Sequence, residues 1–123
     1  MILAGQHKPV IRVGNLSSRR AVMDVRDCVV AYYELMMKPS TGVFNVGGDN
    51  SFTMGDLLCK MLDMYGLSGK VAIETDQKLW RPIDIPIQMP DTDKVKKEIS
   101  WDCKYTIDRT LADLVNYWRA KIA

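Results

Sequence analysis

Residues 10–37 have the sequence VIRVGNLSSRRAVMDVRDCVVAYYELMM, and this stretch decides the fold because it predicts a strand, a loop and a helix in succession. Three β-branched residues between 10 and 13 follow Pro9, which is typical of a short strand. Residues 14–18 contain the Gly, Asn and Ser that favour a turn. From residue 24 to 37 the apolar side chains recur with the period of one helix face, which consists of Val25, Cys28, Val29, Tyr32 and Met36.

The rest of the chain alternates short strands and helices in the same way. Thr53 with Asp56 resembles a capping box, which indicates the start of a helix. Gly66 is suited to end the same helix. The apolar stripe of that helix is Met54, Leu57, Leu58, Met61, Leu62 and Tyr65. Further strands are expected at 43–46 and 71–75. A short helix is expected at 92–99, capped by Asp91 or Thr92. The last helix is expected to begin near residue 106, with a buried face of Ile107, Leu111, Leu114, Val115, Trp118 and Ile122. The sequence predicts one α/β or α+β unit over residues 1–123.

An irregular stretch, residues 76–90, contains three prolines and several large apolar side chains. A loop of this length in a small domain is usually functional or disordered. Because it carries Trp80, Ile83, Ile85, Ile87 and Met89, we expect it to pack on the body of the protein.

Composition argues against several classes of protein. The chain has 17 Lys and Arg against 15 Asp and Glu, a net charge of +2, which does not favour binding to nucleic acid or to an anionic membrane. Nucleic-acid binding through the arginines at 12–26 stays a minor alternative without a recognisable motif. The sequence lacks an apolar run of about 18 residues, and its start lacks the pattern of a signal peptide. We therefore expect a cytoplasmic protein.

The three cysteines, Cys28, Cys59 and Cys103, are far apart and include no CxxC pair. This spacing supports neither a disulfide framework nor a zinc site. Each cysteine lies within or beside an apolar segment, so we expect buried free thiols in a reducing compartment.

Sequence motifs for catalysis are missing from this chain. It has no glycine-rich dinucleotide fingerprint, no P-loop, no nucleophile elbow and no HExxH motif. The pair Gly47-Gly48 follows an expected strand and favours a turn over a phosphate cradle. The single histidine, His7, is expected to be a solvated residue near the terminus.

Two arginine-containing segments are candidates for anion binding. Arg19 and Arg20 precede a helix N-terminus, and a guanidinium group matches phosphate oxygens bidentately. The alternative is that they are solvated or pair with the carboxylates at 24 and 27. Arg81 stands beside a tryptophan in a proline-rich loop and could hold a phosphate, while Asp84 could accept hydrogen bonds from sugar hydroxyls. The alternative there is a salt bridge between Arg81 and Asp84.

Four segments together resemble extended short-chain dehydrogenases that act on nucleotide sugars. They are VGNLSSRR with MDVRD at 13–27, GVFNVGG at 42–48, RPIDIP at 81–86, and the ending that includes Asp91, Lys94, Trp101, LADL at 111–114 and YWR at 117–119. The GNL and RPxD segments most resemble GDP-mannose 4,6-dehydratases and GDP-4-keto-6-deoxymannose reductases. This resemblance covers nearly the whole chain.

The resemblance implies a Rossmann-type enzyme of which this chain is the C-terminal, substrate-binding lobe. It implies that Arg20 and Arg81 hold the nucleotide diphosphate, that Asn15 faces the substrate, and that Asp84 holds the ribose hydroxyls. The implied reaction oxidises the sugar at C4 with NAD or NADP, removes water across C5 and C6, and returns the hydride. The family's glycine-rich loop and its Tyr-x-x-x-Lys pair are both missing from this sequence. We therefore expect no catalytic residue, no bound cofactor and no activity in this chain alone.

The chain departs from the family pattern at four positions, which are Ala21, Val22, Ser100 and Lys104. The first two follow Arg20 and put its orientation in doubt. Apolar surface that the family's dinucleotide-binding half covers would be exposed here, so we expect a homo-oligomer. The alternatives are part of a reductase or epimerase, or a non-catalytic nucleotide-binding or interaction module.

Overall fold

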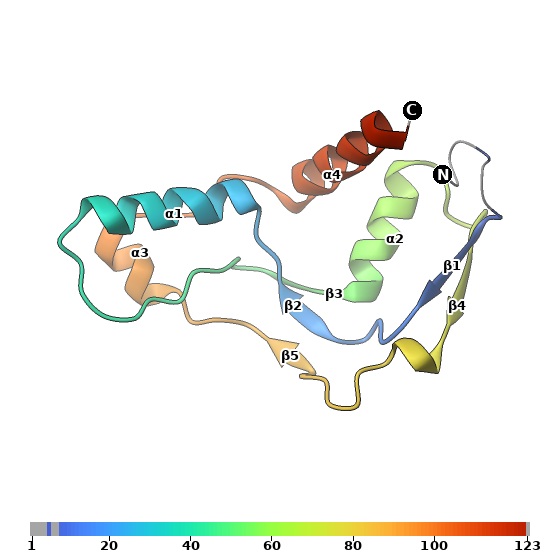
Figure 1. The fold of residues 1–123 in the computed structure, drawn as a ribbon, viewed down its shortest axis with the longest axis horizontal. Coiled ribbons are helices and arrows are strands. Elements are labelled where there is room, and N and C mark those ends of the chain that lie inside the picture. The colour runs from blue at the N-terminus through green and yellow to red at the C-terminus, as the bar shows by residue number, and fades with distance from the viewer. Residues whose placement is uncertain (1–4, 6–7, 123) are drawn as a thin grey trace.

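The structure is a computed structural model that describes residue 5 and residues 8–122, so the expectation for His7 falls outside the described residues. Two small sheets and four α-helices form an elongated molecule, with α1 and α3 at one end and α2, β1 and β4 at the other (Figure 1). The helices are α1 (Val25–Met37), α2 (Met54–Met64), α3 (Asp93–Ile99) and α4 (Ile107–Ile122). The mixed α/β class is confirmed. None of the helices in the described part of the chain is both long and apolar enough to cross a bilayer.

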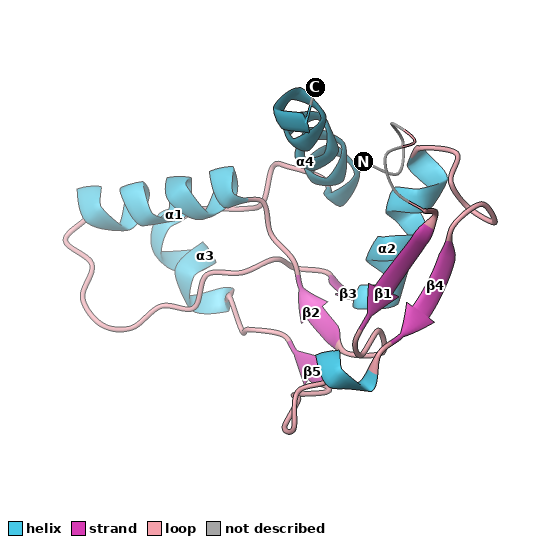
Figure 2. Ribbon diagram, turned by 45° about the vertical axis from the view of Figure 1, so that its right-hand side comes forward, coloured by secondary structure: helices cyan, strands magenta, loops and turns pink. Residues whose placement is uncertain are grey.

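The strands form two separate sheets, and Figure 2 shows them beside α2. In the first, β1 (Val10–Val13) pairs in parallel with β4 (Ala72–Thr75). In the second, β2 (Arg19–Ala21) lies between β3 (Ser51–Thr53), which is antiparallel to it, and β5 (Ile87–Gln88), which is parallel. The sequence did not predict β2, β3 and β5, because such short strands have no periodicity of their own.

The expected start and end of α2 are confirmed. Thr53 Oγ1 accepts a hydrogen bond from the Asp56 N–H at 2.9 Å, and Asp56 accepts one in return from the Thr53 N–H at 3.1 Å. These bonds satisfy two N–H groups that a helix N-terminus otherwise leaves without partners. Gly66 follows the helix with a φ of +64°, the left-handed conformation that glycine adopts at low cost. Leu57 and Leu62 of the expected stripe are buried.

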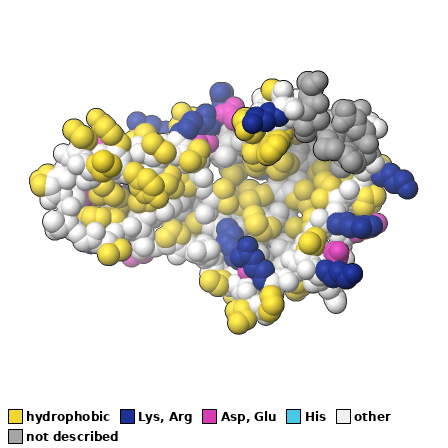
Figure 3. All heavy atoms as spheres, viewed as in Figure 1, with side chains coloured by type: hydrophobic (Ala, Val, Ile, Leu, Met, Phe, Trp, Pro, Cys, Tyr) yellow, Lys and Arg dark blue, Asp and Glu magenta, His cyan; other side chains and the backbone are white. Residues whose placement is uncertain are grey.

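The expected helix at 24–37 forms as α1, and its apolar face is not the side that packs into the protein. The buried side chains of α1 are Asp27 and Ala31, and the apolar face predicted from the sequence is mostly exposed, with Met36 at 83%. Figure 3 shows hydrophobic side chains gathered over this end of the molecule. The orientation of α1 follows from Asp27, whose carboxylate accepts hydrogen bonds from the N–H groups of Lys104 and Tyr105 at 3.0 and 3.1 Å.

The main core cluster lies between α1 and α3. It contains Ala31, Val95, Ile99 and Trp101, all nearly or fully buried, with Met23, Leu35, Phe44, Val46 and Cys103 packed around them. The Trp101 Nε1–H donates to the Asp27 carbonyl at 3.1 Å, so its polar edge is satisfied. This cluster also includes two side chains of residues 43–46, although that segment is no strand.

The expected strand at 43–46 does not form, and no strand among the described residues pairs with this segment. Side chains hold the segment instead, since Lys94 Nζ donates to the Val43 carbonyl at 2.8 Å and Asn45 Nδ2 donates to the Asp91 carbonyl at 3.2 Å. The residues thus have strand propensity, but a strand also requires a neighbouring backbone, which propensity alone does not provide.

Three other packing expectations are wrong in part. The apolar side chains of the 76–90 loop are mostly exposed, with Ile83 at 89%, and the loop contains only a short 3₁₀ turn, Gln77–Leu79, and β5. In α4, Leu111 is buried, but Leu114 and Trp118 are exposed. The cysteines are free as expected, yet Cys59 is exposed and the other two are half-buried.

Candidate functional site

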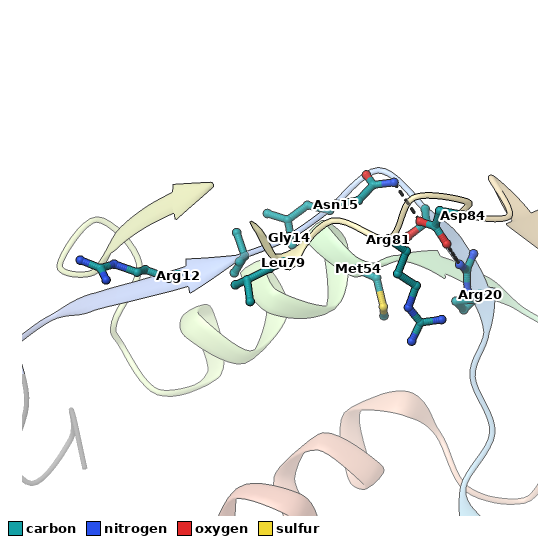
Figure 4. Close-up of a pocket in the computed structure, with 11 residues that line it drawn as sticks. Arg12, Gly14, Asn15, Arg20, Met54, Leu79, Arg81 and Asp84 are labelled. Atoms are coloured by element: carbon teal, nitrogen blue, oxygen red, sulfur yellow. Dashed lines mark hydrogen bonds and ion pairs between the residues drawn. The ribbon is translucent and has the colours of Figure 1, made fainter. Parts of the chain in front are cut away.

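A cavity of about 370 Å³ lies where β1 runs into the 14–18 turn and the 79–84 loop passes alongside it. Its lining includes all four residues that the sequence suggested for substrate binding, which are Asn15, Arg20, Arg81 and Asp84 (Figure 4). The first two come from the segment around β2, and the last two come from the loop more than 60 residues later. The fold thus brings the two candidate motifs to one place.

Asp84 is at the centre of a hydrogen-bonded network in this cavity. Its carboxylate accepts from Arg20 Nη2 at 2.7 Å and from Asn15 Nδ2 at 3.0 Å. Burial raises the pKa of Asp84, but the Asn15 hydrogen bond and the Arg20 charge outweigh it, so the pKa lies below its usual value. The side chain is therefore a carboxylate at neutral pH and can accept further hydrogen bonds from a ligand.

The Asn15 amide is oriented by the turn in which it lies. Asn15 Oδ1 accepts from the Ser17 N–H at 2.9 Å and from Ser17 Oγ at 2.7 Å. Because the amide oxygen is engaged locally, its NH₂ group points across the chain toward Asp84. This Asx-type turn is the physical role of the Gly-Asn-Leu-Ser segment at 14–17.

Arg20 is held by the backbone as well as by its ion pair. Its Nη1 donates to the Ile85 carbonyl at 2.7 Å and to the Arg19 carbonyl at 2.8 Å. Both members of the Arg20–Asp84 pair have about a fifth of their side-chain surface exposed. The departures at Ala21 and Val22 therefore leave Arg20 well oriented, because the loop carbonyl and Asp84 position it.

Arg81 differs from Arg20 in its surroundings. Its side chain is exposed at the rim of the cavity, and the structure contains no hydrogen bond or ion pair from it to any described residue. The alternative of a salt bridge between Arg81 and Asp84 is wrong, because Asp84 pairs with Arg20 instead. Its guanidinium group remains available to a ligand.

The other arginines of the 12–26 stretch have separate structural roles. Arg19 donates to the Ser51 carbonyl at 2.9 Å, and Arg26 pairs with Asp24 and Asp113, each at 2.8 Å. Neither Arg19 nor Arg20 pairs with the carboxylates at 24 and 27, so that alternative is wrong. The arginines point to different parts of the molecule and do not form one continuous basic patch, which further disfavours nucleic-acid binding.

Sequence reasoning missed part of the cavity wall, including Met54, Leu79 and Gly14. Position 14 requires glycine, because a Cβ there would lie 2.7 Å from the Leu79 carbonyl oxygen. Any larger residue would push the two segments of the site apart. A glycine directly after a strand signals such a close approach in general, but not which segment approaches.

The described residues do not form a dinucleotide cradle. Such a cradle needs a strand, a glycine-rich turn and a helix in succession, whereas β1 continues through its turn into another strand. Gly47 and Gly48 lead into β3, and they pack against Pro90 and the Val22 carbonyl with no room for a Cβ. The described part of the chain also contains no cluster of metal-ligating side chains.

Comparison with known proteins places this arrangement in a family. A family model described as GDP-mannose 4,6 dehydratase matches residues 1–114. The structure of RMD from Pseudomonas aeruginosa, complexed with NADPH, is similar with a TM-score of 0.88 at 19% identity, over 98% of this chain and 39% of that one.

Two further solved structures are similar over most of this chain. An epimerase from Burkholderia cenocepacia, described there as putative, has a TM-score of 0.82 at 26% identity, over 91% of this chain and 37% of that one. The UDP-glucose 4-epimerase of Thermotoga maritima, with UDP-glucose, has a TM-score of 0.79 at 22% identity, over 92% and 36%. This chain spans less than two fifths of the length of these proteins. It belongs to the GDP-mannose 4,6-dehydratase family.

Proposed function

We propose that this chain is the nucleotide-sugar-binding portion of an NAD(P)-dependent 4,6-dehydratase and that its ligand is a GDP-sugar, GDP-mannose in particular. The observation that carries this proposal is the pair of arginines at one cavity, of which Arg81 has no counter-ion among the described residues while Arg20 is neutralised by Asp84. A net positive, open guanidinium beside an oriented carboxylate matches a ligand with a diphosphate next to sugar hydroxyls.

The two arginines divide the work of binding. Arg81 offers its planar fork of donors to the diphosphate, because bidentate pairing with phosphate oxygens is the strongest contact it can form. Arg20 keeps Asp84 ionised and in place. The remaining lone pairs of Asp84 accept hydrogen bonds from the ribose hydroxyls, and the Asn15 amide at the same carboxylate faces the ligand.

The hydride chemistry belongs to a nicotinamide cofactor for which this chain offers no cradle. The contribution of these residues is to bind and orient the nucleotide sugar, so we expect binding without turnover by the chain alone. Among the similar structures, one was solved with NADPH and another with UDP-glucose, so both kinds of ligand occur in these larger proteins.

A second candidate is the equivalent portion of a UDP-sugar epimerase. Two of the similar structures described above are epimerases by their descriptions, and one of them carries UDP-glucose. The two candidates share the diphosphate site and differ in the base, so a nucleotide comparison separates them.

The test is a calorimetric titration of the full chain with GDP, UDP and dTDP. We expect GDP to bind with a Kd of about 1 mM or tighter, that is about −4 kcal/mol or better, and the other two to bind at least tenfold more weakly. Preference for UDP would favour the epimerase. No binding of any nucleotide by a chain that melts cooperatively would contradict the proposal and favour an interaction module.

Variants locate the site. Arg81→Ala and Arg20→Ala should each weaken GDP binding by about tenfold, because each removes or misplaces a charge-assisted contact. Arg109→Ala is the matched control, since Arg109 is an exposed arginine on α4 whose one ion pair with the described residues is with Asp113. Affinity unchanged in both cavity variants would overturn the site assignment.

A further inference from the structure

The cavity that holds Asp84 continues along β1 to a further arginine. Arg12 contributes to the same lining, and Figure 4 shows it at the opposite end from Asp84, with Leu79 between them. Asn15, which contacts Asp84, follows Arg12 by three residues of nearly extended chain, a span of up to about 10 Å. A nucleotide whose ribose lies at Asp84 can therefore extend its base toward Arg12.

Arg12 forms an ion pair with a glutamate on the neighbouring strand. Arg12 on β1 and Glu74 on β4 are partners in the parallel register, so their side chains lie on the same side of the sheet. Arg12 Nε donates to Glu74 Oε2 at 3.4 Å, and the two side chains are 72% and 55% exposed. Because an exposed pair of this length contributes little to stability, the fold does not depend on it.

Both charged groups retain hydrogen-bonding atoms that the fold does not use. The one hydrogen bond from the Arg12 guanidinium to a described residue uses Nε, so both Nη groups can still donate. Glu74 Oε1 accepts no hydrogen bond from the described residues. This end of the cavity thus presents a planar fork of donors directly beside a carboxylate with unused lone pairs.

The two groups together match the edge of guanine more closely than that of another base. Guanine presents the acceptors O6 and N7, which pair with an arginine fork. Next to O6 it presents the donors N1–H and the 2-amino group, which suit a carboxylate. Adenine has an amino group in place of O6, and uracil has the acceptor O2 in place of the 2-amino group. Adenine would therefore point a donor at the guanidinium, and uracil would point an acceptor at the carboxylate.

We propose that Arg12 and Glu74 read the base of the bound nucleotide and select guanine. Arg12 donates to O6 and N7, and Glu74 accepts from N1–H and the 2-amino group. Leu79, an apolar side chain that is 54% exposed in the cavity wall, packs against the face of the ring. This inference rests on the proposed function, because Arg81 and Asp84 must hold the diphosphate and the ribose before the base can be read.

The test is an NMR titration of the full chain with GDP, IDP and ADP, since chemical shifts follow millimolar binding. IDP is GDP without the 2-amino group, so it isolates the contact with Glu74. We expect the unchanged chain to prefer GDP to IDP by about tenfold and GDP to ADP by at least about tenfold.

Two variants assign these preferences to the pair. Glu74→Gln should bind GDP and IDP equally, because the charged acceptor is lost. Arg12→Ala should weaken GDP by about tenfold and leave ADP unchanged. Glu98→Gln is the matched control, because Glu98 is an exposed glutamate on α3 at the other end of the molecule, and it should keep both preferences (Figure 1). The same spectra establish that each variant is folded.

The outcomes separate this inference from the proposed function. Equal affinities for GDP and IDP in the unchanged chain, or a preference that survives in Glu74→Gln, overturn the reading of the base. Equal losses of GDP and ADP in Arg12→Ala also overturn it, because Arg12 would then attract the phosphates. In each of these cases, binding that still depends on Arg81 leaves the proposed function standing. A folded chain that binds none of the three nucleotides overturns both.

Discussion

The two ends of this molecule use carboxylates in opposite ways. At the α1–α3 end, Asp27 is 3% exposed, and its oxygens accept from two backbone N–H groups of a distant loop. At the cavity end, Asp84 is held by Asn15 and Arg20 but still borders open space. The first arrangement satisfies a buried group completely and stabilises the fold. The second leaves hydrogen-bonding capacity unused, which is what a binding site requires.

The largest expected effect is at the buried end. Trp101→Ala removes a side chain that is 4% exposed and also the hydrogen bond to the Asp27 carbonyl. We expect it to lower the free energy of unfolding by about 4 kcal/mol, measured by urea denaturation. Trp118→Ala is the control, because Trp118 is half exposed, and it should cost less than about 1 kcal/mol. Equal losses would contradict the assignment of the core to this end.

Removal of the buried carboxylate should have the next largest effect. Asp27→Ala leaves the N–H groups of Lys104 and Tyr105 without their partner, and we expect a loss of about 3 kcal/mol in the same assay. Asp102→Ala is the control, since Asp102 is exposed and its ion pair with Lys96 is a surface pair worth about 0.5 kcal/mol. A loss below about 1 kcal/mol for Asp27→Ala would show that water replaces the carboxylate.

The contribution of the buried Asp24 carboxylate to the free energy of unfolding should depend on pH. A hydrogen bond from Arg26 and a weaker one from Thr110 hold the pKa of Asp24 well below its usual value near 3.8. Burial acts in the opposite direction and raises the pKa, but the hydrogen bonds outweigh it. Because the folded pKa is depressed, the carboxylate stabilises the fold at pH values above the unfolded pKa, and this contribution is lost as the pH falls toward the folded pKa.

Asp24→Asn keeps the helix N-cap but removes the charge, so we expect a loss of about 2 kcal/mol at pH 7. The difference from the unchanged chain should shrink as the pH is lowered below about 4. Unfolding free energies measured at pH 7 and pH 3 test this, and a difference that is the same at both values would contradict the role of the charge.

The smallest expected effect on stability is at the cavity. Arg81→Ala should change the free energy of unfolding by less than about 0.5 kcal/mol, because Arg81 makes no polar contact with the described residues. The same variant should lose nucleotide affinity in the titration. A loss of more than about 1 kcal/mol in stability would mean that Arg81 supports the fold, and the contrast between the two ends would then be weaker.

Elements with local signals were predictable from the sequence. The start of α2 depends on Thr53 and Asp56, three residues apart, and its end depends on Gly66, so their chemistry is visible in a short window. Three of the four residues of β1 are β-branched, and in β4 the β-branched Ile73 and Thr75 alternate with other residues. The site residues Asn15, Arg20, Arg81 and Asp84 were named from motif resemblance, and the fold brings them to one cavity, although their role in binding is still a prediction.

The sequence by itself determined which segments are α-helical, where α2 begins and ends, and which polar residues are candidates for a site. Tertiary structure decided which face of α1 is buried and which arginine pairs with Asp84. Periodicity reports that a helix has an apolar face, but the partner of that face comes from residues far along the chain. Asp27 meets Lys104 and Tyr105 from more than 70 residues away, and these two hydrogen bonds hold the same side of α1 that buries Ala31 in the core.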